Sequence, residues 1–228
     1  MGGFLGGGDP YTPTLNPDGW TQVLDEQFND LDAWTVFDNA PFWTFEQMAA
    51  NVALVGGGGV TLTGDDTLVG DYYPGAGIVT NQSYLYGYFE IRCKFPAGDS
   101  GVWPAFWMWP TTVFDLNQPE IDVLEYPGGN TQYYVGNWLH SNGAKEESII
   151  LKPNLNNSYH KYACRWRPGE IQFYFDDSIV AIHTNLIPDQ AMLLWIQQGI
   201  DGWTGDPLPP EVFPVTLEVD YVKVWQEA

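Results

Sequence analysis

Residues 84–95 read YLYGYFEIRCKF, and the alternation within this stretch indicates the fold class. From Phe89 to Lys94, apolar and charged residues follow one another at every step. Such a period of two is typical of a β-strand that buries one face and exposes the other. A helix would need apolar residues three and four positions apart, and no long segment of the chain has that spacing. The stretch therefore predicts a strand.

Short apolar and aromatic segments of the same kind recur along the chain, separated by clusters of Gly, Pro, Asn and Asp. They lie at 60–63, 159–166, 171–175 and 215–225. Many short strands with frequent turn signals are typical of an antiparallel sandwich. The sequence has no internal repeat and no linker after residue 18. We therefore expect an all-β fold, with residues 19–228 as one domain and 1–18 as a flexible Gly/Pro-rich extension.

The chain of 228 residues is strongly acidic, with 29 Asp and Glu against 8 Lys and Arg and a formal net charge of −21. Binding to phosphate or sulfate groups relies on clustered basic residues, so the composition argues against nucleic acid and sulfated polymers as partners. No stretch approaches the ~20 apolar residues that a membrane-spanning helix needs. We expect an aromatic-rich globular protein that is a monomer and binds neither nucleic acid nor a membrane.

One short segment concentrates acidic residues: Glu120–Glu125 reads EIDVLE. Ile, Val and Leu fill its other positions, which predicts a strand. In a regular strand Glu120 and Asp122 share a face, whereas Glu125 points the other way. A β-bulge near 123–124 would return Glu125 to the shared face. Convergence of the three carboxyl groups therefore depends on a bulge.

Three carboxyl groups on one face repel one another, so at least one pKa must rise and that group can stay protonated near neutral pH. A protonated and an ionised carboxyl group together meet the requirement for retaining hydrolysis of a glycosidic bond, in which they stand ~5–5.5 Å apart. Two other interpretations remain open at this point. One is a solvated edge strand, and the other is a site for a hard cation bound by oxygen atoms.

Tryptophans gather just before the acidic segment, in residues 102–109, VWPAFWMW. Trp103, Trp107 and Trp109 stand at alternating positions, so a strand would place all three on one face. Core packing is the usual role of aromatic residues, but a row of indole rings also suits the apolar faces of sugar rings. Four further tryptophans would extend such a surface. They are Trp43, Trp138, Trp195 and Trp203.

Taken together, these motifs resemble glycoside hydrolase family 16, and within it the laminarinase-like endo-β-1,3-glucanases. Residues 86–92 are similar to the family's G-x-F-E-x-R strand, 103–108 to its W-P-A-F-W-M segment and 120–125 to its E-[IL]-D-x-x-E signature. Further similar segments follow in order at 159–163, 166–168, 171–176 and 219–224. The resemblance implies a β-jelly-roll sandwich of two antiparallel sheets with an open concave substrate cleft.

The resemblance also implies roles for single residues. Glu120 would be the nucleophile, Asp122 its helper and Glu125 the acid/base of a retaining mechanism. The longer E-x-D-x-x-E spacing occurs in laminarinases, agarases and carrageenases, and the negative charge of the chain disfavours carrageenan, a sulfated polymer. The candidates for substrate binding are Trp103, Trp107, Asn39, Trp138 and His140.

The activity implied by the resemblance is hydrolysis of laminarin-like β-1,3-glucan through a covalent glycosyl-enzyme. The alternatives are hydrolysis or transglycosylation of another neutral polysaccharide, such as mixed-linkage β-glucan or agarose, and a module that binds β-glucan without cleaving it.

Such polysaccharide substrates lie outside cells. The N-terminal segment MGGFLGGGD lacks the basic and apolar regions of a signal peptide. We therefore expect a trimmed extracellular enzyme or, as the alternative, an enzyme carried on a virion.

The sequence departs from the family pattern in places where relatives border the sugar cleft. Gly77 stands where many laminarinase-like members have a basic residue, and 195–203 replaces the N-L-A-V-G-G-x-W segment. A further departure concerns the structural calcium site of the family. The acidic calcium ligand that precedes a Phe in the family is replaced here by Gln27. We expect no required cofactor, and Glu26 and Asp220 are the candidate ligands for a structural calcium.

Overall fold

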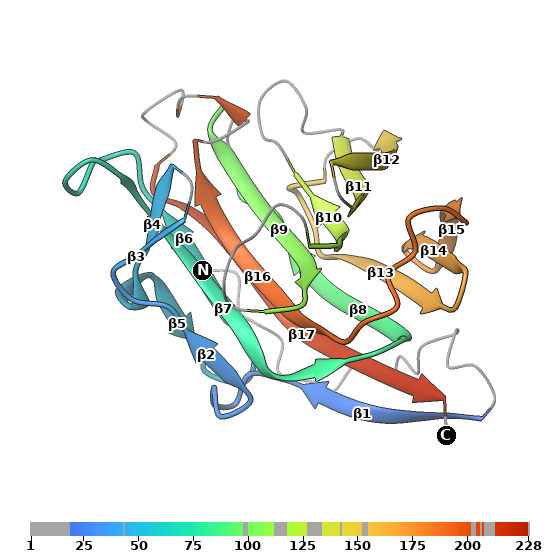
Figure 1. The fold of residues 1–228 in the computed structure, drawn as a ribbon. Coiled ribbons are helices and arrows are strands. Elements are labelled where there is room, and N and C mark those ends of the chain that lie inside the picture. Colours follow the sequence, from blue (N-terminus) through green and yellow to red (C-terminus); the bar gives the residue numbers. More distant parts are fainter. Residues whose placement is uncertain are drawn as a thin grey trace.

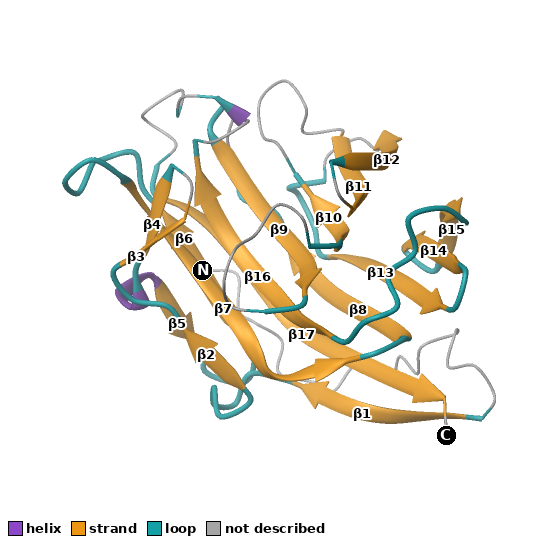
Figure 2. Ribbon diagram, in the orientation of Figure 1, coloured by secondary structure: helices purple, strands orange, loops and turns teal. Residues whose placement is uncertain are grey.

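The computed structural model describes residues 19–42, 44–97, 100–111, 118–126, 134–141, 143–151, 155–201, 204, 205, 207 and 213–227. Within these residues the chain is almost entirely β, as Figure 2 shows. The element η1, a short 3-10 turn at Ala49–Asn51, is the helical segment named among them. The prediction of an all-β fold without long helices is confirmed.

The described strands form two sheets that pack face to face (Figure 1). The first sheet has eight described strands in the order β15 (Ser178–His183), β14 (Glu170–Phe175), β13 (His160–Arg167), β8 (Gly87–Lys94), β17 (Val215–Glu227), β6 (Val60–Gly64) and β5 (Val52–Leu54), with β1 (Trp20–Glu26) also paired to β17. The second has nine, in the order β12 (Ala144–Leu151), β11 (Tyr134–Ser141), β10 (Glu120–Glu125), β9 (Val102–Trp109), β16 (Met192–Ile200), β7 (Tyr73–Tyr84), β4 (Phe45–Gln47) and β3 (Ala40–Phe42), with β2 (Trp34–Val36) on β7.

Nearly every strand pair is antiparallel, as a jelly-roll sandwich requires. The exception among the described pairs is β4, which runs parallel to β7 and places Gln47 opposite Gly75. Neighbouring strands often lie far apart in the sequence: β9 pairs with β10 on one side and with β16 on the other. This connectivity brings residues near 40, 107, 122 and 195 onto one sheet.

The main hydrophobic core lies between the two sheets, and alternate residues of each strand fill it. Phe89 and Ile91 of β8 point into it from the first sheet, and Phe106 and Met108 of β9 enter it from the second. Each of these side chains is 0 or 1% exposed. Burial of such a side chain contributes roughly 1.5–3 kcal/mol, so this alternation accounts for much of the stability of the sandwich.

The polar face of β8 is less solvated than its charged residues suggest. Glu90 is 1% exposed and accepts hydrogen bonds from the hydroxyl groups of Tyr88 (3.2 Å) and Tyr221 (2.9 Å). Burial raises the pKa of the Glu90 carboxyl group. The alternation predicted the correct two faces, but aromatic neighbours cover the second one as well.

The stretch 84–95 is also not one continuous strand. β7 ends at Tyr84, and β8 begins at Gly87. Tyr86 and Gly87 have positive φ angles of 59° and 148°. A Cβ atom at residue 87 would lie 2.7 Å from the carbonyl oxygen of Trp225, so only glycine permits this close turn.

Candidate active site

A β-bulge in β10 places the acidic residues. Asp122 lies opposite Trp107 of β9, whereas Glu125 lies opposite Ala105, and the register shifts between these positions. The pairing of β10 with β11 shifts in the same interval. Val123 and Leu124 are both buried in the core between the sheets. The predicted bulge is therefore confirmed, and Glu125 returns to the face that carries Asp122.

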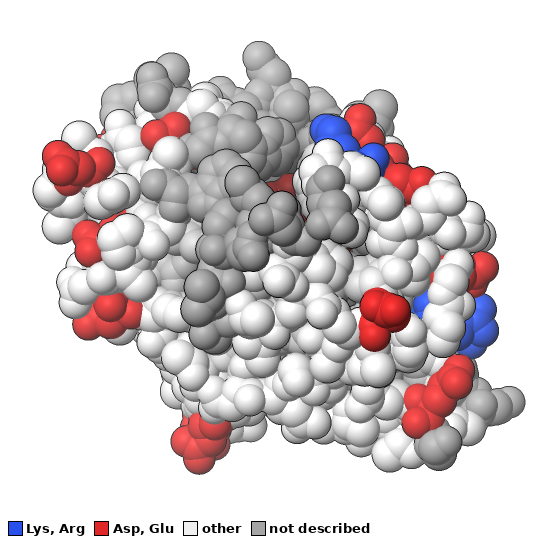
Figure 3. All heavy atoms as spheres, viewed as in Figure 1, with Lys and Arg blue, Asp and Glu red and all other residues white. Residues whose placement is uncertain are grey.

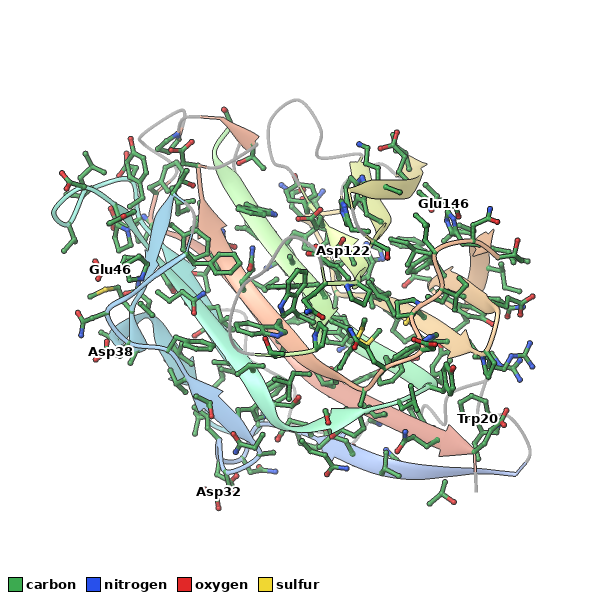
Figure 4. All side chains as sticks on the ribbon, in the orientation of Figure 1. Trp20, Asp32, Asp38, Glu46, Asp122 and Glu146 are labelled. Carbon is green, nitrogen blue, oxygen red and sulfur yellow. The ribbon has the colours of Figure 1, made fainter. Side chains whose placement is uncertain are left out.

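We call the face of the second sheet that points away from the first sheet the site face. It carries Glu120, Asp122 and Glu125, and Figure 4 labels Asp122 on it. Glu120 and Asp122 share a hydrogen bond. The Nε2 atom of His140, opposite Glu120 on β11, lies 3.4 Å from Oδ2 of Asp122. The indole Nε1 of Trp103 donates a 2.8 Å hydrogen bond to Oε1 of Glu125.

The electrostatics of the acidic residues follow from their burial. Asp122 is 2% exposed. Desolvation raises the pKa of Glu120 well above its usual range, and the nearby charges of Asp122 and Glu125 raise it further. Burial and the charge of Glu125 likewise raise the pKa of Asp122. Two coupled carboxyl groups with raised pKa values can hold one proton between them at neutral pH. An ionised carboxylate can therefore lie beside a protonated one within this pair.

Two sets of acidic residues could in principle hold a metal ion. Glu120, Asp122 and His140 offer ligand atoms that lie within 4.8 Å of one another. The calcium candidates fit less well. Both carboxyl oxygens of Glu26 already accept hydrogen bonds, from the backbone N–H of Phe28 (2.5 Å) and from Nε1 of Trp34 (3.0 Å).

The second calcium candidate, Asp220, forms an ion pair and hydrogen bond with the guanidinium group of Arg92. A cationic side chain therefore already neutralises this carboxylate. In this arrangement both Glu26 and Asp220 are already engaged by protein donors.

The tryptophans of β9 occupy the site face, as predicted from their spacing. Trp107 stacks on Trp195 of β16 with ring centroids 5.1 Å apart, and Trp109 lies edge-on to Trp107 at 6.0 Å. These three rings form one aromatic cluster with Val79 and Ala105. Trp103 contacts the edge of Phe45 at 6.1 Å. The indole rings thus lie beside the acids on the same face.

A pocket of about 210 Å³ opens next to this aromatic cluster. Its walls include Phe37, Phe42, Gln47, Trp107, Trp109 and Trp195. The sequence reasoning found the tryptophans but missed Phe37, Phe42 and Gln47, which belong to no motif. The parallel placement of β4 on β7 brings Gln47 to the sheet, and no local sequence signal indicated that pairing.

The remaining predicted residues have different positions. Trp138 lies opposite Asp122 on β11 and is 6% exposed. Asn39 is exposed in the turn before β3, with a positive φ of 49°, and it adjoins Ala40 in the pocket wall. Trp43 and Trp203 lie outside the described residues, as does the 1–18 extension.

Cys93 and Cys164 are buried free thiols in neighbouring strands of the first sheet. Within the described residues, no helix is both long and apolar enough to cross a membrane.

The chain is similar in sequence to known bacterial enzymes. A beta-glucanase of Rhodothermus marinus is 32% identical over 201 residues, which cover 76% of this chain and 70% of that protein. The endo-1,3-1,4-beta-glycanase EglC of Rhizobium meliloti is 32% identical over 161 residues, or 68% of this chain. The chain spans only 34% of the length of EglC.

Solved structures show the same fold. The laminarinase of Rhodothermus marinus superimposes with a TM-score of 0.80 at 28% identity, covering 92% of this chain and 98% of that one. The laminarinase catalytic domain of Thermotoga maritima gives a TM-score of 0.82 at 22% identity, covering 92% and 100%. The family profile for glycosyl hydrolases family 16 matches residues 40–209, and the chain belongs to this family of glycoside hydrolases.

Proposed function

We propose that the chain is a retaining endo-β-1,3-glucanase. The observation that carries the proposal is the bulge at Val123, because it gathers Glu120, Asp122 and Glu125 beside a row of indole rings. An ionised carboxylate, a protonated partner and an aromatic surface are the parts that retaining hydrolysis of a sugar polymer needs. The β-glucanase and laminarinase relatives support a β-glucan substrate.

In the proposed mechanism, Glu120 attacks the anomeric carbon while Glu125 gives a proton to the departing glycosidic oxygen. A glycosyl ester on Glu120 results, and one product sugar chain leaves. Glu125, now ionised, takes a proton from a water molecule, which attacks the anomeric carbon and releases Glu120. The hydrogen bond from Trp103 holds the Glu125 carboxyl group in place for both steps. Asp122 shares a proton with Glu120 and adjusts its charge as the ester forms and breaks.

Two variants test the roles of the glutamates. We expect Glu120→Gln to abolish release of reducing sugar from laminarin while oligosaccharide binding persists, because the amide cannot act as nucleophile. Glu125→Gln should lower kcat on laminarin by about 10²–10⁴-fold, the usual contribution of a general acid. The same variant should retain formation of the glycosyl-enzyme from aryl glycosides whose leaving group needs no proton. Cleavage of laminarin by Glu120→Gln at the wild-type rate would exclude the nucleophile assignment.

Mixed-linkage β-glucan is a second candidate substrate, favoured by the similarity to EglC, an endo-1,3-1,4-beta-glycanase. A panel of laminarin, mixed-linkage β-glucan, agarose and carrageenan separates the two, with products resolved by size. Highest kcat/KM on laminarin supports the first proposal. Products longer than the starting oligosaccharide would instead reveal transglycosylation.

We further propose that the enzyme acts outside the cell on this neutral polymer, as a monomer. An extracellular location agrees with a polymeric substrate too large to enter cells. Activity in the culture medium of the source would support secretion, and activity that sediments with virus particles would support the virion alternative. Light scattering of the purified protein gives its oligomeric state.

A further inference from the structure

Glycines on the site face make room for the side chains of β4. An ideal Cβ atom on Gly75 would lie 2.5 Å from the ring of Phe45. One on Gly77 would lie 2.5 Å from Oε1 and 2.7 Å from Cδ of Gln47. The amide of Gln47 therefore occupies the space that any side chain at 77 would need.

The Gln47 amide has unused hydrogen-bonding capacity. The side chain is 2% exposed, and within the described part of the chain its Oε1 atom has no hydrogen-bond partner. Among the same residues, Nε1 of Trp107 and Nε1 of Trp195 are likewise buried without a partner. All three residues line the same pocket. A buried polar group without a partner is costly and uncommon in folded proteins, so three in one pocket point to a ligand.

The chemistry of the pocket selects the kind of ligand. Its lining residues carry one buried amide oxygen as acceptor, two buried indole N–H donors and aromatic walls, and none of the described lining residues is charged. A hexose ring matches this set, because it has apolar faces and hydroxyl groups that both donate and accept. A sulfated or carboxylated sugar would lack a cation in this lining and would meet the acceptor oxygen of Gln47.

The pocket lies to one side of the catalytic acids. Trp107 of β9 lies opposite Asp122 of β10 on one side and opposite Trp195 of β16 on the other. Gly77 of β7, which Gln47 covers, pairs with Gln197, two residues after Trp195 on β16, and is three strands from β10. At ~4.8 Å per strand, the backbone of Gly77 lies about 14 Å across the sheet from β10. We therefore expect the hexose that contacts Gln47 to lie to one side of the bond that is cleaved.

We propose that Gln47 is a specificity-determining residue, which accepts a hydrogen bond from a hydroxyl group of a neutral, unsubstituted hexose unit held in this pocket. The inference rests on the proposed function, since it places this hexose in the same glucan chain that the acids cleave. Gln47 acts through binding and takes no part in the bond-breaking steps.

The test replaces Gln47 by methionine, which keeps the length of the side chain and removes the amide. Binding of laminarihexaose to the inactive Glu120→Gln protein is measured by calorimetry, with and without Gln47→Met. We expect Kd to rise about tenfold, which corresponds to loss of one buried hydrogen bond. In the active background, kcat/KM should fall for long oligosaccharides and stay unchanged for oligosaccharides too short to reach the pocket.

Gln198→Met is the matched control. Gln198 is 0% exposed and also has an unpartnered Oε1 atom, but its side chain points between the sheets, towards Gly64. Its replacement should leave Kd unchanged. Gly77→Ala is the complementary variant, because its methyl group would displace the Gln47 amide without removing it. This variant should weaken binding as Gln47→Met does.

A folded Gln47→Met protein that binds laminarihexaose within about twofold of its parent would overturn the inference. So would an equal loss of kcat/KM on short and long oligosaccharides, since that indicates a general disturbance of the site. Absence of laminarin cleavage by the wild type, combined with Gln47-dependent binding, would overturn the proposed hydrolysis and leave this inference standing.

Discussion

Glu120 and Asp122, the proposed nucleophile and its helper, lower the stability of the fold at neutral pH. Both carboxyl groups are desolvated beside like charges, so the pKa of each is raised in the folded protein. The folded state then binds protons that the unfolded chain has already released, and stability grows as the pH falls from neutral through the raised pKa. At neutral pH the site is therefore under electrostatic strain that its chemistry requires.

Removal of one charge should relieve this strain. We expect Glu120→Gln to raise Tm at about pH 8 by about 2–4 °C, the shift that ~1 kcal/mol produces in a domain of this size. The gain should shrink towards about pH 4, where the glutamate is mostly protonated in both folded and unfolded states. Calorimetry at the two pH values measures the effect, with exposed Glu227→Gln as control. A lower Tm for Glu120→Gln at about pH 8 would contradict the account.

The convergence of the three acids on one face was predictable at this scale, whereas the pocket was not. Glu120, Asp122 and Glu125 stand within one motif, and their convergence depended on a single local feature, the bulge. Gln47 is a lone polar residue in an unremarkable segment. Its importance depends on glycine at position 77, about thirty positions away in the sequence, and a single sequence does not show that pairing.

At the scale of elements, a polar cluster joins the edge strands of the two sheets. Glu146 of β12 accepts hydrogen bonds from Asn185 (2.7 Å) and pairs with Nδ1 of His183 from β15 (2.8 Å). Nε2 of the same imidazole lies 3.4 Å from Oγ of Ser148. Figure 4 labels Glu146 near β12 and β15. Because β12 pairs with β11, this cluster also supports the strand that carries His140.

We expect Glu146→Gln to loosen the β11–β12 hairpin. The free energy of unfolding should fall by about 1 kcal/mol at neutral pH, because hydrogen bonds to a partly exposed carboxylate contribute modestly. Hydrogen bonds from Asn185 and His183 lower the pKa of Glu146, so its contribution is present at neutral pH and is lost as the pH falls through that lowered value. Urea unfolding at several pH values measures this, and KM for laminarin should rise modestly.

The matched control for this prediction is Glu170→Gln. Glu170 pairs with Arg167 (2.9 Å) within one hairpin of the first sheet and joins no other element. Its replacement should leave amide exchange in β11 and β12 unchanged, whereas Glu146→Gln should accelerate it. Equal exchange in the two variants would show that the cluster does not hold the hairpin.

Strand existence was predictable from alternation, but strand boundaries and partners were less so. Residues 84–95 appeared as one strand, yet a turn with positive φ at Tyr86 and Gly87 divides them. The parallel pairing of β4 with β7 had no signal, because three-residue strands show no period. Both differences arise from long-range packing, which local patterns do not record.

For the whole molecule, the dominant property is its charge. The 29 acidic residues outnumber the 8 basic ones. In the view of Figure 3, acidic side chains lie scattered around the described surface, and basic side chains appear in few places. Self-repulsion across such a surface opposes compact folding.

Salt should therefore stabilise the folded protein at neutral and alkaline pH. Between about 0.1 M and 1 M NaCl the Debye length falls from ~10 Å to ~3 Å, which screens repulsion between carboxylates on neighbouring elements. We expect Tm at about pH 8 to rise steadily over this range, as measured by calorimetry. Close to the isoelectric point of about 4.1 the net charge is small, so the same salt series should change Tm little. A Tm that falls with salt at about pH 8 would mean that the ion pairs, such as Lys94 with Glu218, outweigh the general repulsion.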